Sequence, residues 1–427
     1  MQQSLRARAA GAVLPATAFI LPPLAVFAPL GDAPLLAVAA VAALFLDGQR
    51  CLAGLAALKS LAVLLAALGL WGAASAAWSI LPGHSLFEGA RFLTLSAGGL
   101  VFWASARAAS DDERRRVVEA LTLGILAALI LLAIERFAHA PITRWWLQMP
   151  ASQNLNLSRF DRGVTVLVLA LWPLLCAASP LWLRAILLLA VLGMAAVMAS
   201  ATALLAALAS LVAFALARLA PRIVAGALIA GLLVLSIAIP LAVPSYDTTI
   251  ALHAEAPWIK WSGIHRLLIW RFAADRVAER PILGWGMDAS RDIPGGKVEF
   301  NDVLPTLHYP SGAQRLPLHP HDAVLQLQLE LGILGLTLGL AIMVWPIWRI
   351  GWRAPLAPGR RAGALALSVA VLIVGLLSFG VWQAWWLSTV WLASGIFVGT
   401  GTGVGAGALD PPYSSERRPN RDAITAP

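Results

Sequence analysis

The stretch VVEALTLGILAALILLAIER, residues 117–136, decides the fold class of this chain. It is almost entirely apolar between Glu119 and the closing pair Glu135 and Arg136, and it is as long as the roughly 20 residues that an α-helix needs to cross a bilayer. Similar runs recur along the chain, separated by proline, glycine and clusters of charge. The sequence therefore predicts a polytopic, all-α membrane protein.

The composition supports this interpretation. Of 427 residues, 59% are apolar and only 12% are charged, against about 25% charged in an ordinary soluble domain. A soluble globular protein is thereby excluded, and the formal charge of +9 concerns the two sides of a membrane rather than nucleic acid, which we do not expect as a partner. The two cysteines, Cys51 and Cys176, fall at or inside apolar segments and suggest no disulfide framework.

Breaking the chain at its charge clusters gives about twelve transmembrane helices and one large loop late in the chain. We expect residues 1–243 to carry nine spans, 244–322 to form the loop with short helices, and 323–402 to carry the last three. Residues 403–427, rich in glycine and proline, predict a disordered cytoplasmic tail. The expected spans lie near 10–29, 33–47, 52–77, 91–106, 117–136, 163–180, 183–199, 201–217, 223–243, 323–345, 362–380 and 382–402.

The distribution of basic residues predicts the orientation of these spans. An even number of crossings places both termini on one side, and Arg6, Arg8 and the tail segment 416–421 make that side cytoplasmic by the positive-inside rule. The connecting loops expected on the same side are also rich in arginine. They contain Arg50, Arg107, Arg114, Arg115, Arg116, Arg184, Arg218, Arg222, Arg349, Arg353, Arg360 and Arg361.

The loop 244–322 lies outside the cytoplasm in this scheme, yet it is also basic. Its cations are Lys260, Arg266, Arg271, Arg276, Arg280, Arg291, Lys297 and Arg315. Because a loop of this length is largely exempt from the orientation rule, its arginines need another explanation. One is binding of an anionic substrate. The other is attraction to anionic lipid headgroups.

The segment 263–286 predicts an amphipathic helix that ends at Pro281. Arg266 and Arg271 flank its apolar stripe, where a planar guanidinium suits bidentate binding of phosphate; stacking on an aromatic ring and snorkelling are the alternatives. The residues expected on the apolar stripe are Leu267, Trp270, Ala274, Val277 and Ala278, and those expected on the wet face are Asp275, Arg276, Glu279 and Arg280.

Two histidines precede the tenth expected span, in LHPHDAVLQLQLELGILGL (318–336). Asp322 is placed to cap the helix, so His319 and His321 stand just before its start. A histidine beside surplus arginines is a candidate general base, although a purely structural role is the alternative. On a continuous helix one face would carry His321, Leu325, Gln328, Gly332, Gly335 and Gly339, and its glycines would allow close approach of a neighbouring helix.

These residues resemble the signature of the O-antigen ligase and polymerase superfamily of bacterial envelope glycosyltransferases, His-[Asn/Ser/Gln]-x9-Gly-x-x-Gly-[Thr/Val]. The spacing from His321 to Gly332 and Gly335 matches, while Asp322 and Leu336 depart from the pattern. The run RLLIWRFAADRVAERPILGWGMD (266–288) is similar to the family's arginine-to-PLLGWG segment, and SRFDRGVTVLVLALWP (158–173) to its arginine-bearing entry into a mid-chain span.

The resemblance implies a fold similar to that of C-type glycosyltransferases in the bacterial inner membrane, with an active site in a large periplasmic loop. It implies inverting transfer of a glycan from undecaprenyl pyrophosphate to a sugar hydroxyl, on lipid A-core for a ligase or on another glycan for a polymerase. His321 would be the catalytic base, and Arg266, Arg162 and Arg271 would hold the donor pyrophosphate. His319, Asp322 and Arg159 would support them, with Asp322 either raising the pKa of His321 or fixing its tautomer.

No cofactor is expected, and no metal, since the loop has no DxD pair. A competing hypothesis from another class is a transporter or flippase for lipid-linked sugars, but its charges should be spread through the spans, which are nearly free of charge here. Two further residues receive little weight: His84 has no partner motif, and Glu330 is expected to point away from His321 and pair with another helix.

Overall fold

The computed structural model describes residues 2–150, 152–153, 155–304 and 313–401, and within these ranges the protein is helical without a named β-strand. The predicted tail 403–427 lies outside the described residues. The long apolar helices are α1 (Gln2–Phe27), α2 (Asp32–Leu55), α3 (Lys59–Ala74), α4 (Pro82–Arg107), α5 (Asp111–Phe137), α7 (Asp161–Leu175), α8 (Leu181–Val197), α9 (Ala201–Leu219), α10 (Pro221–Ala242), α14 (Ala323–Trp348), α15 (Pro358–Leu377) and α16 (Ala384–Gly399).

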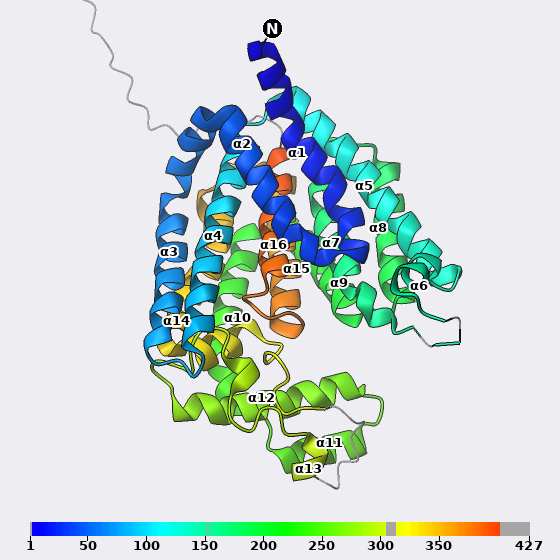
Figure 1. Cartoon of the computed structure of the whole chain (residues 1–427). Coiled ribbons are helices and arrows are strands. Elements are labelled where there is room, and N and C mark those ends of the chain that lie inside the picture. The colour runs from blue at the N-terminus through cyan, green and yellow to red at the C-terminus, as the bar shows by residue number, and fades with distance from the viewer. Residues whose placement is uncertain (1, 151, 154, 305–312, 402–427) are drawn as a thin grey trace, which may run out of the picture.

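These helices coincide with the expected spans, and most of them run side by side in one bundle (Figure 1). Eight helical segments among the described residues are long and apolar enough to cross a bilayer, and α8 and α16 are shorter apolar helices. The chain is therefore an integral, multi-pass membrane protein. The number of twelve crossings stays a prediction.

Large apolar side chains on the outside of the bundle are exposed, as a lipid-facing surface requires. Phe45 is 72% exposed, Leu189 68% and Ile223 73%. In water such a surface would bind other apolar surfaces strongly, whereas in the hydrocarbon of a bilayer its exposure carries no free-energy penalty.

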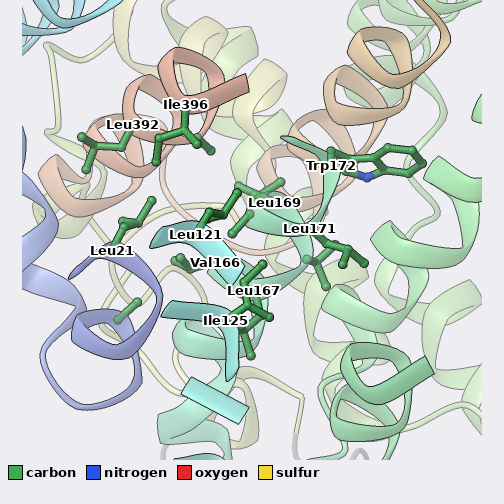
Figure 2. Close-up of a cluster of buried hydrophobic side chains, with 14 of the residues drawn as sticks. Leu21, Leu121, Ile125, Val166, Leu167, Leu169, Leu171, Trp172, Leu392 and Ile396 are labelled. Carbon is green, nitrogen blue, oxygen red and sulfur yellow. The ribbon is translucent and has the colours of Figure 1, made fainter. Parts of the chain in front are cut away.

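One helix, α7, lies at the centre of the largest buried cluster. Its residues 163–174 are all buried, and Figure 2 shows Val166, Leu167, Leu169 and Leu171 among side chains of neighbouring helices. The neighbours in that view come from α1, α5 and α16, and include Leu21, Leu121, Ile125, Leu392 and Ile396. Because lipid is as apolar as leucine, this cluster is held by close packing rather than by exclusion of water.

The fourth helix begins earlier than the sequence predicted. We expected a span from residue 91, but α4 starts at Pro82, nine residues earlier. The reason is charge pairing one turn apart, since Arg91 forms an ion pair with Glu88 within the helix. Two opposite charges that neutralise each other one turn apart are tolerated in an apolar helix at a position where a single charge would not be.

Segment 244–322 contains the expected short helices, α11 (Tyr246–Glu255), α12 (Trp261–Glu279) and α13 (Phe300–Val303). They gather beyond one end of the bundle, with α12 lying across it, while the N-terminus of α1 lies at the other end (Figure 1). We call these the α12 end and the N-terminal end. A separate apolar cluster, which includes Ile264, Phe272, Phe300 and Leu325, joins α12 to α13 and to the start of α14.

The expected apolar stripe of α12 is confirmed for Ala274 and Val277 but was wrong for Ala278. The buried residues are Ile264, Leu268, Ile269, Phe272, Ala273, Ala274 and Val277, whereas Ala278 is exposed. The expected wet face also fails for Arg276 and Arg280, because their guanidinium groups stack on Phe272 and Trp285, with the Arg280 carbon 4.0 Å from the ring centroid. Phe272 on the helix and Trp285 after it attract these arginines away from solvent, and helical periodicity alone does not predict such contacts.

Candidate active site

The two histidines sit in a tight turn that is held from three sides. The backbone N–H of His321 donates to Nδ1 of His319 at 3.1 Å, and the indole N–H of Trp270 on α12 donates to the carbonyl of Pro320 at 2.9 Å. The His319 ring also lies 3.3 Å from the side-chain nitrogen of Gln383, just before α16. His321 itself has a left-handed backbone, φ 58°, which is uncommon outside glycine and needs such support.

The ring of His321 is fixed by a backbone carbonyl. Its Nδ1 lies 2.6 Å from the carbonyl oxygen of Ser378, which can only accept, so Nδ1–H is the donor. In the neutral imidazole Nε2 then carries the lone pair, and among the described residues it has no hydrogen-bond partner. Burial lowers the pKa of His321 to about 4, with a smaller contribution from the charge of Arg266, so the ring is neutral at pH 7.

His319 is also neutral, because burial lowers its pKa to about 3. Since its Nδ1 accepts from the backbone of His321, it acts on the turn rather than offering a free base. The structure thus gives the two histidines different tasks: His319 shapes the turn, and His321 presents a nitrogen lone pair.

Asp322 caps α14, as the sequence predicted, by accepting from the backbone N–H of Leu325 at 2.7 Å. The idea that it raises the pKa of His321 or fixes its tautomer was wrong. Its carboxylate turns into the helix start, the pKa of His321 is lowered rather than raised, and Ser378 fixes the tautomer. Burial raises the pKa of Asp322 to about 7.

The helix after the histidines is broken in the middle, which corrects the expected continuous glycine face. Gly332 has φ 63° and ψ −162°, a conformation that is essentially restricted to glycine. A Cβ there would lie 2.0 Å from the carbonyl oxygen of Ile282. Gly332 therefore serves the approach of a loop, not of a neighbouring helix.

The loop that fills the break is the segment 281–286, PILGWG. Its backbone pairs with the broken helix: Trp285 N–H donates to Leu329 O at 3.0 Å, Gly286 N–H donates to Glu330 O at 2.8 Å, and Ile333 N–H donates to Pro281 O at 3.0 Å. The interruption of α14 thus leaves these backbone groups paired, as a membrane environment requires. The PILGWG segment and the glycine motif after His321, which the sequence analysis described separately, therefore contact each other at the break in α14.

The structure brings Arg266 close to the histidine turn. It connects Arg162 to the turn through Trp385 and Gln383. The charge of Arg266 acts on both His321 and Asp161, which places α12, the turn and the start of α7 around one region. Arg162 lies beside Trp385 at the start of α16, with its guanidinium carbon 5.2 Å from the ring centroid. Among the described residues Arg162 has no carboxylate within ion-pair distance.

Two other predicted arginines are placed less favourably. Arg271 forms an ion pair with Asp275 one turn along α12, and this hydrogen bond raises its pKa. Arg159 is exposed, and its guanidinium lies 4.0 Å from the sulfur of Met149. No contact among the described residues joins either of them to His321.

Sequence reasoning gave too little weight to a polar network beside the turn. His84 Nε2 lies 2.8 Å from Asp288, Arg291 donates to the same carboxylate at 2.6 Å, and the charge of Arg291 reaches His319. No motif pointed to His84, because Asp288 lies about 200 residues away in the sequence.

Glu330 is the hub that joins this network to the helix break. It is fully buried and accepts hydrogen bonds from the backbone N–H of Asp288 at 2.6 Å, from the side chain of Gln326 at 3.1 Å, and from Ser290 and Trp382. The expectation that it pairs with another helix was wrong, because its partners lie on its own helix, in the loop and in the segment before α16. An acid in an apolar helix is itself a sign of function, which the sequence did offer.

The side chains of His84, Glu88 and Asp288 place three ligand-type atoms within 4.8 Å of one another. The acids of this group are already paired with Arg91 and Arg291, which reduces the negative charge available to a cation. The expectation that the protein needs no metal stays a prediction.

Comparison with known proteins shows which family this chain resembles. The family model described as O-antigen ligase matches residues 185–340, which include Arg266, His321 and the helix break. A Rickettsia bellii protein named "Putative polysaccharide ligase" is 28% identical over 332 residues, 75% of this chain and 76% of the relative. A similarly named protein of Rickettsia conorii is 30% identical over 68% of this chain and 68% of the relative. Another, from Rickettsia prowazekii, is 30% identical over 65% of this chain and 66% of the relative.

Fold and site together define a multi-pass membrane protein that carries a neutral histidine and two arginines near one end of its bundle. The similarity extends over two thirds of the chain and of the Rickettsia conorii relative. The chain belongs to the O-antigen ligase family.

Proposed function

We propose that this protein transfers a glycan from undecaprenyl pyrophosphate to a sugar hydroxyl of lipid A-core, at the periplasmic face of the bacterial inner membrane. The observation that carries the proposal is the neutral His321 ring, whose Nδ1–H is held by Ser378 while Nε2 keeps its lone pair. In this proposal both termini are cytoplasmic, and the α12 end of the bundle is periplasmic.

The reaction needs one base and one stabilised leaving group. The acceptor hydroxyl gives its proton to Nε2 of His321 as its oxygen forms a bond to the anomeric carbon. The bond from that carbon to the pyrophosphate oxygen breaks on the opposite side, and the electron pair leaves with undecaprenyl pyrophosphate. A single direct displacement of this kind inverts the anomeric configuration and needs no metal or other cofactor.

The leaving pyrophosphate would be held by Arg162 and Arg266, whose fixed positive charges match the charge that develops on it. Arg162 suits this role because it has no carboxylate partner among the described residues, and Arg266 because its charge already reaches His321. Arg271 remains a weaker candidate, since Asp275 already compensates its charge. Arg159 has no part in donor binding in this proposal, because it lies exposed beside Met149.

The test is complementation of a deletion strain, read as the lipopolysaccharide profile on a gel. We expect the wild-type chain to restore O-antigen on lipid A-core, and His321→Ala and Arg266→Ala to fail at normal membrane abundance. Arg159→Ala is the matched control and should restore the profile. Full activity of His321→Ala would remove this residue from the mechanism.

The same gel separates the ligase from a polymerase of the same superfamily. Loss of all O-antigen from lipid A-core in the deletion strain supports the ligase. Core that carries a single repeat would show a polymerase, and unchanged lipopolysaccharide with a missing exopolysaccharide would show that the chain acts on another polymer. Accumulation of lipid-linked glycan on the cytoplasmic side would instead support a flippase.

A further inference from the structure

A cavity of about 870 Å³ lies inside the bundle, apart from the histidine turn. It opens between α3 and α4 on one side and α14, α15 and α16 on the other, and apolar residues such as Leu65, Phe92 and Trp391 line most of it. Its volume is at the upper end of ligand pockets, which measure about 300–1,000 Å³. His321, Arg162 and Arg266 do not line it, so it is not the proposed active site.

One end of the cavity is strongly basic. The arginines that line it are Arg107, Arg114, Arg349 and Arg360, at the end of α4, the start of α5, the end of α14 and the start of α15. These helix ends lie at the N-terminal end of the bundle, opposite α12 (Figure 1). The cavity is therefore amphipathic, with an apolar body and a cationic mouth.

Two of these arginines already have partners that fix their place. Arg114 donates to the carbonyl of Val398 at 3.3 Å and interacts with Asp111 at 3.9 Å. Arg360 lies 3.5 Å from the hydroxyl of Thr400 and stacks on Phe397. Arg114 and Arg360 therefore stabilise this end of the bundle through contacts within the protein. They also add positive charge to the mouth of the cavity.

Arg107 and Arg349 differ from the other two, because their guanidinium groups have no hydrogen-bond or ion-pair partner in the part of the chain that the structure describes. Arg349 only stacks on Trp345, 5.4 Å from the ring centroid. Both are half-buried, and their like charges act on each other. Such a pair is unfavourable beside apolar walls unless an anion lies between or beside the two groups.

The length of the apolar part fits one lipid chain of the same leaflet. Along α4 the lining runs from Phe92 through Ser96 to Trp103 and then reaches Arg107. At 1.5 Å per residue the apolar part is about 16 Å long, close to half of the roughly 30 Å hydrocarbon core. An occupant with its headgroup at the arginines would place its chain within one leaflet.

We propose that this cavity binds an anionic phospholipid of the leaflet at the N-terminal end, with its phosphate between Arg107 and Arg349 and an acyl chain along α4 towards Trp382. Charge complementarity selects an anionic over a zwitterionic headgroup. The lipid joins α3 and α4 to α14, α15 and α16, and thereby stabilises the bundle from the end opposite the histidine turn. The site does not depend on the proposed transfer reaction.

Native mass spectrometry of the purified full-length protein in detergent tests this assignment, with dioleoyl phosphatidylglycerol and dioleoyl phosphatidylcholine as the added probes. The variant is Arg107→Gln with Arg349→Gln. The matched control is Arg115→Gln with Arg353→Gln, which removes the same charge from exposed positions at the same end. We expect the variant to bind phosphatidylglycerol about 25-fold more weakly, on the basis of about a factor of five per arginine, and the control to bind it as the wild type does.

A second variant tests the chain rather than the headgroup. Ser368, on α15, lines the cavity, and Ser368→Phe should reduce phosphatidylglycerol binding while it leaves the four arginines in place. Its thermal unfolding without added lipid shows that the fold is intact, and added phosphatidylglycerol should raise the Tm of the wild type but not of Ser368→Phe.

Three results would overturn the assignment. Equal binding of the two lipids, or equal phosphatidylglycerol binding by the variant and the control, would show ordinary contact lipid on the outside of the bundle. Displacement of the bound lipid by millimolar inorganic phosphate would show that the arginines bind a free anion instead.

Discussion

Two helices of this bundle, α7 and α14, are both buried on most sides, yet they are built in opposite ways. Residues 163–174 of α7 are apolar apart from Thr165 and are held mainly by close packing, to which Trp172 adds a hydrogen bond to Ser210 on α9. In α14 the buried face includes Gln326 and Glu330, and the helix is broken at Gly332. Polar groups and backbone strain are thus concentrated in the helix that follows the histidine turn.

The difference shows where this fold tolerates the free-energy cost of buried polar groups and of a broken helix. In hydrocarbon each unpaired backbone group costs several kcal/mol, so a broken helix persists only where another segment supplies partners. The segment 281–286 does so here, and Asp288, two residues after it, donates its backbone N–H to Glu330 in the polar network. The break in α14 therefore lets the segment 281–286 form hydrogen bonds with the bundle near His321.

The largest expected effect on stability comes from a side chain placed at that break. Gly332→Ala would place a Cβ against the carbonyl of Ile282 in a backbone conformation that side chains do not adopt, at a cost of about 3 kcal/mol or more. We expect little folded protein in the membrane, measured by size-exclusion chromatography of a fluorescent fusion. Gly231→Ala in α10, where a Cβ meets nothing within 4 Å, is the control and should fold normally. Equal yields of the two variants would contradict the role given to Gly332.

Glu330→Gln should have the next largest effect on stability. A carboxylate accepts from all four of its donors, whereas an amide presents an N–H to at least one of them and leaves a buried mismatch of about 2 kcal/mol. Thermal unfolding of the purified protein should show a lower Tm. Glu279→Gln, which loses only a part-exposed pair with Arg276, should shift the Tm little. Equal Tm values would show that the network around Glu330 adds nothing to stability.

Arg162 and Arg159 allow a sharper comparison, because they lie three residues apart, Arg159 just before α7 and Arg162 in its first turn. If Arg162 holds the donor, Arg162→Ala should lower the transfer rate at subsaturating donor by about 100-fold, near 2.7 kcal/mol. Arg159→Ala should change it by less than about twofold, since that side chain is exposed. An assay with purified donor and acceptor measures both, and a larger loss in Arg159→Ala would reverse the assignment.

Much of this architecture could be predicted from the sequence, because apolar runs of membrane length leave the backbone few choices. The cap at Asp322 also followed from local pattern, and the proximity of Arg266 to His321 from the family resemblance. The break at Gly332 did not, since it depends on a loop about 50 residues earlier in the chain. The pairing of His84 with Asp288 likewise needed the fold, because no spacing rule connects residues so far apart.

The pH dependence should be the mildest effect near neutrality. Because burial holds the pKa of His321 at about 4, the base is already unprotonated at pH 7. At subsaturating donor the rate should therefore be nearly constant down to about pH 5, and should fall about tenfold per unit below about pH 4 as Nε2 takes up a proton. Initial rates measured from pH 3.5 to 8 check this. An acid limb near 6.5 would show that the imidazole is solvated rather than buried.

The most direct test of the account is the transfer rate of purified His321→Ala with donor binding measured on the same sample. The central claim is that His321 supplies the base while Arg162 and Arg266 hold the donor. It predicts a rate about 100- to 10,000-fold below the wild type, with an unchanged Kd for the undecaprenyl pyrophosphate donor. A wild-type rate in His321→Ala, or a loss explained entirely by weaker donor binding, would contradict it.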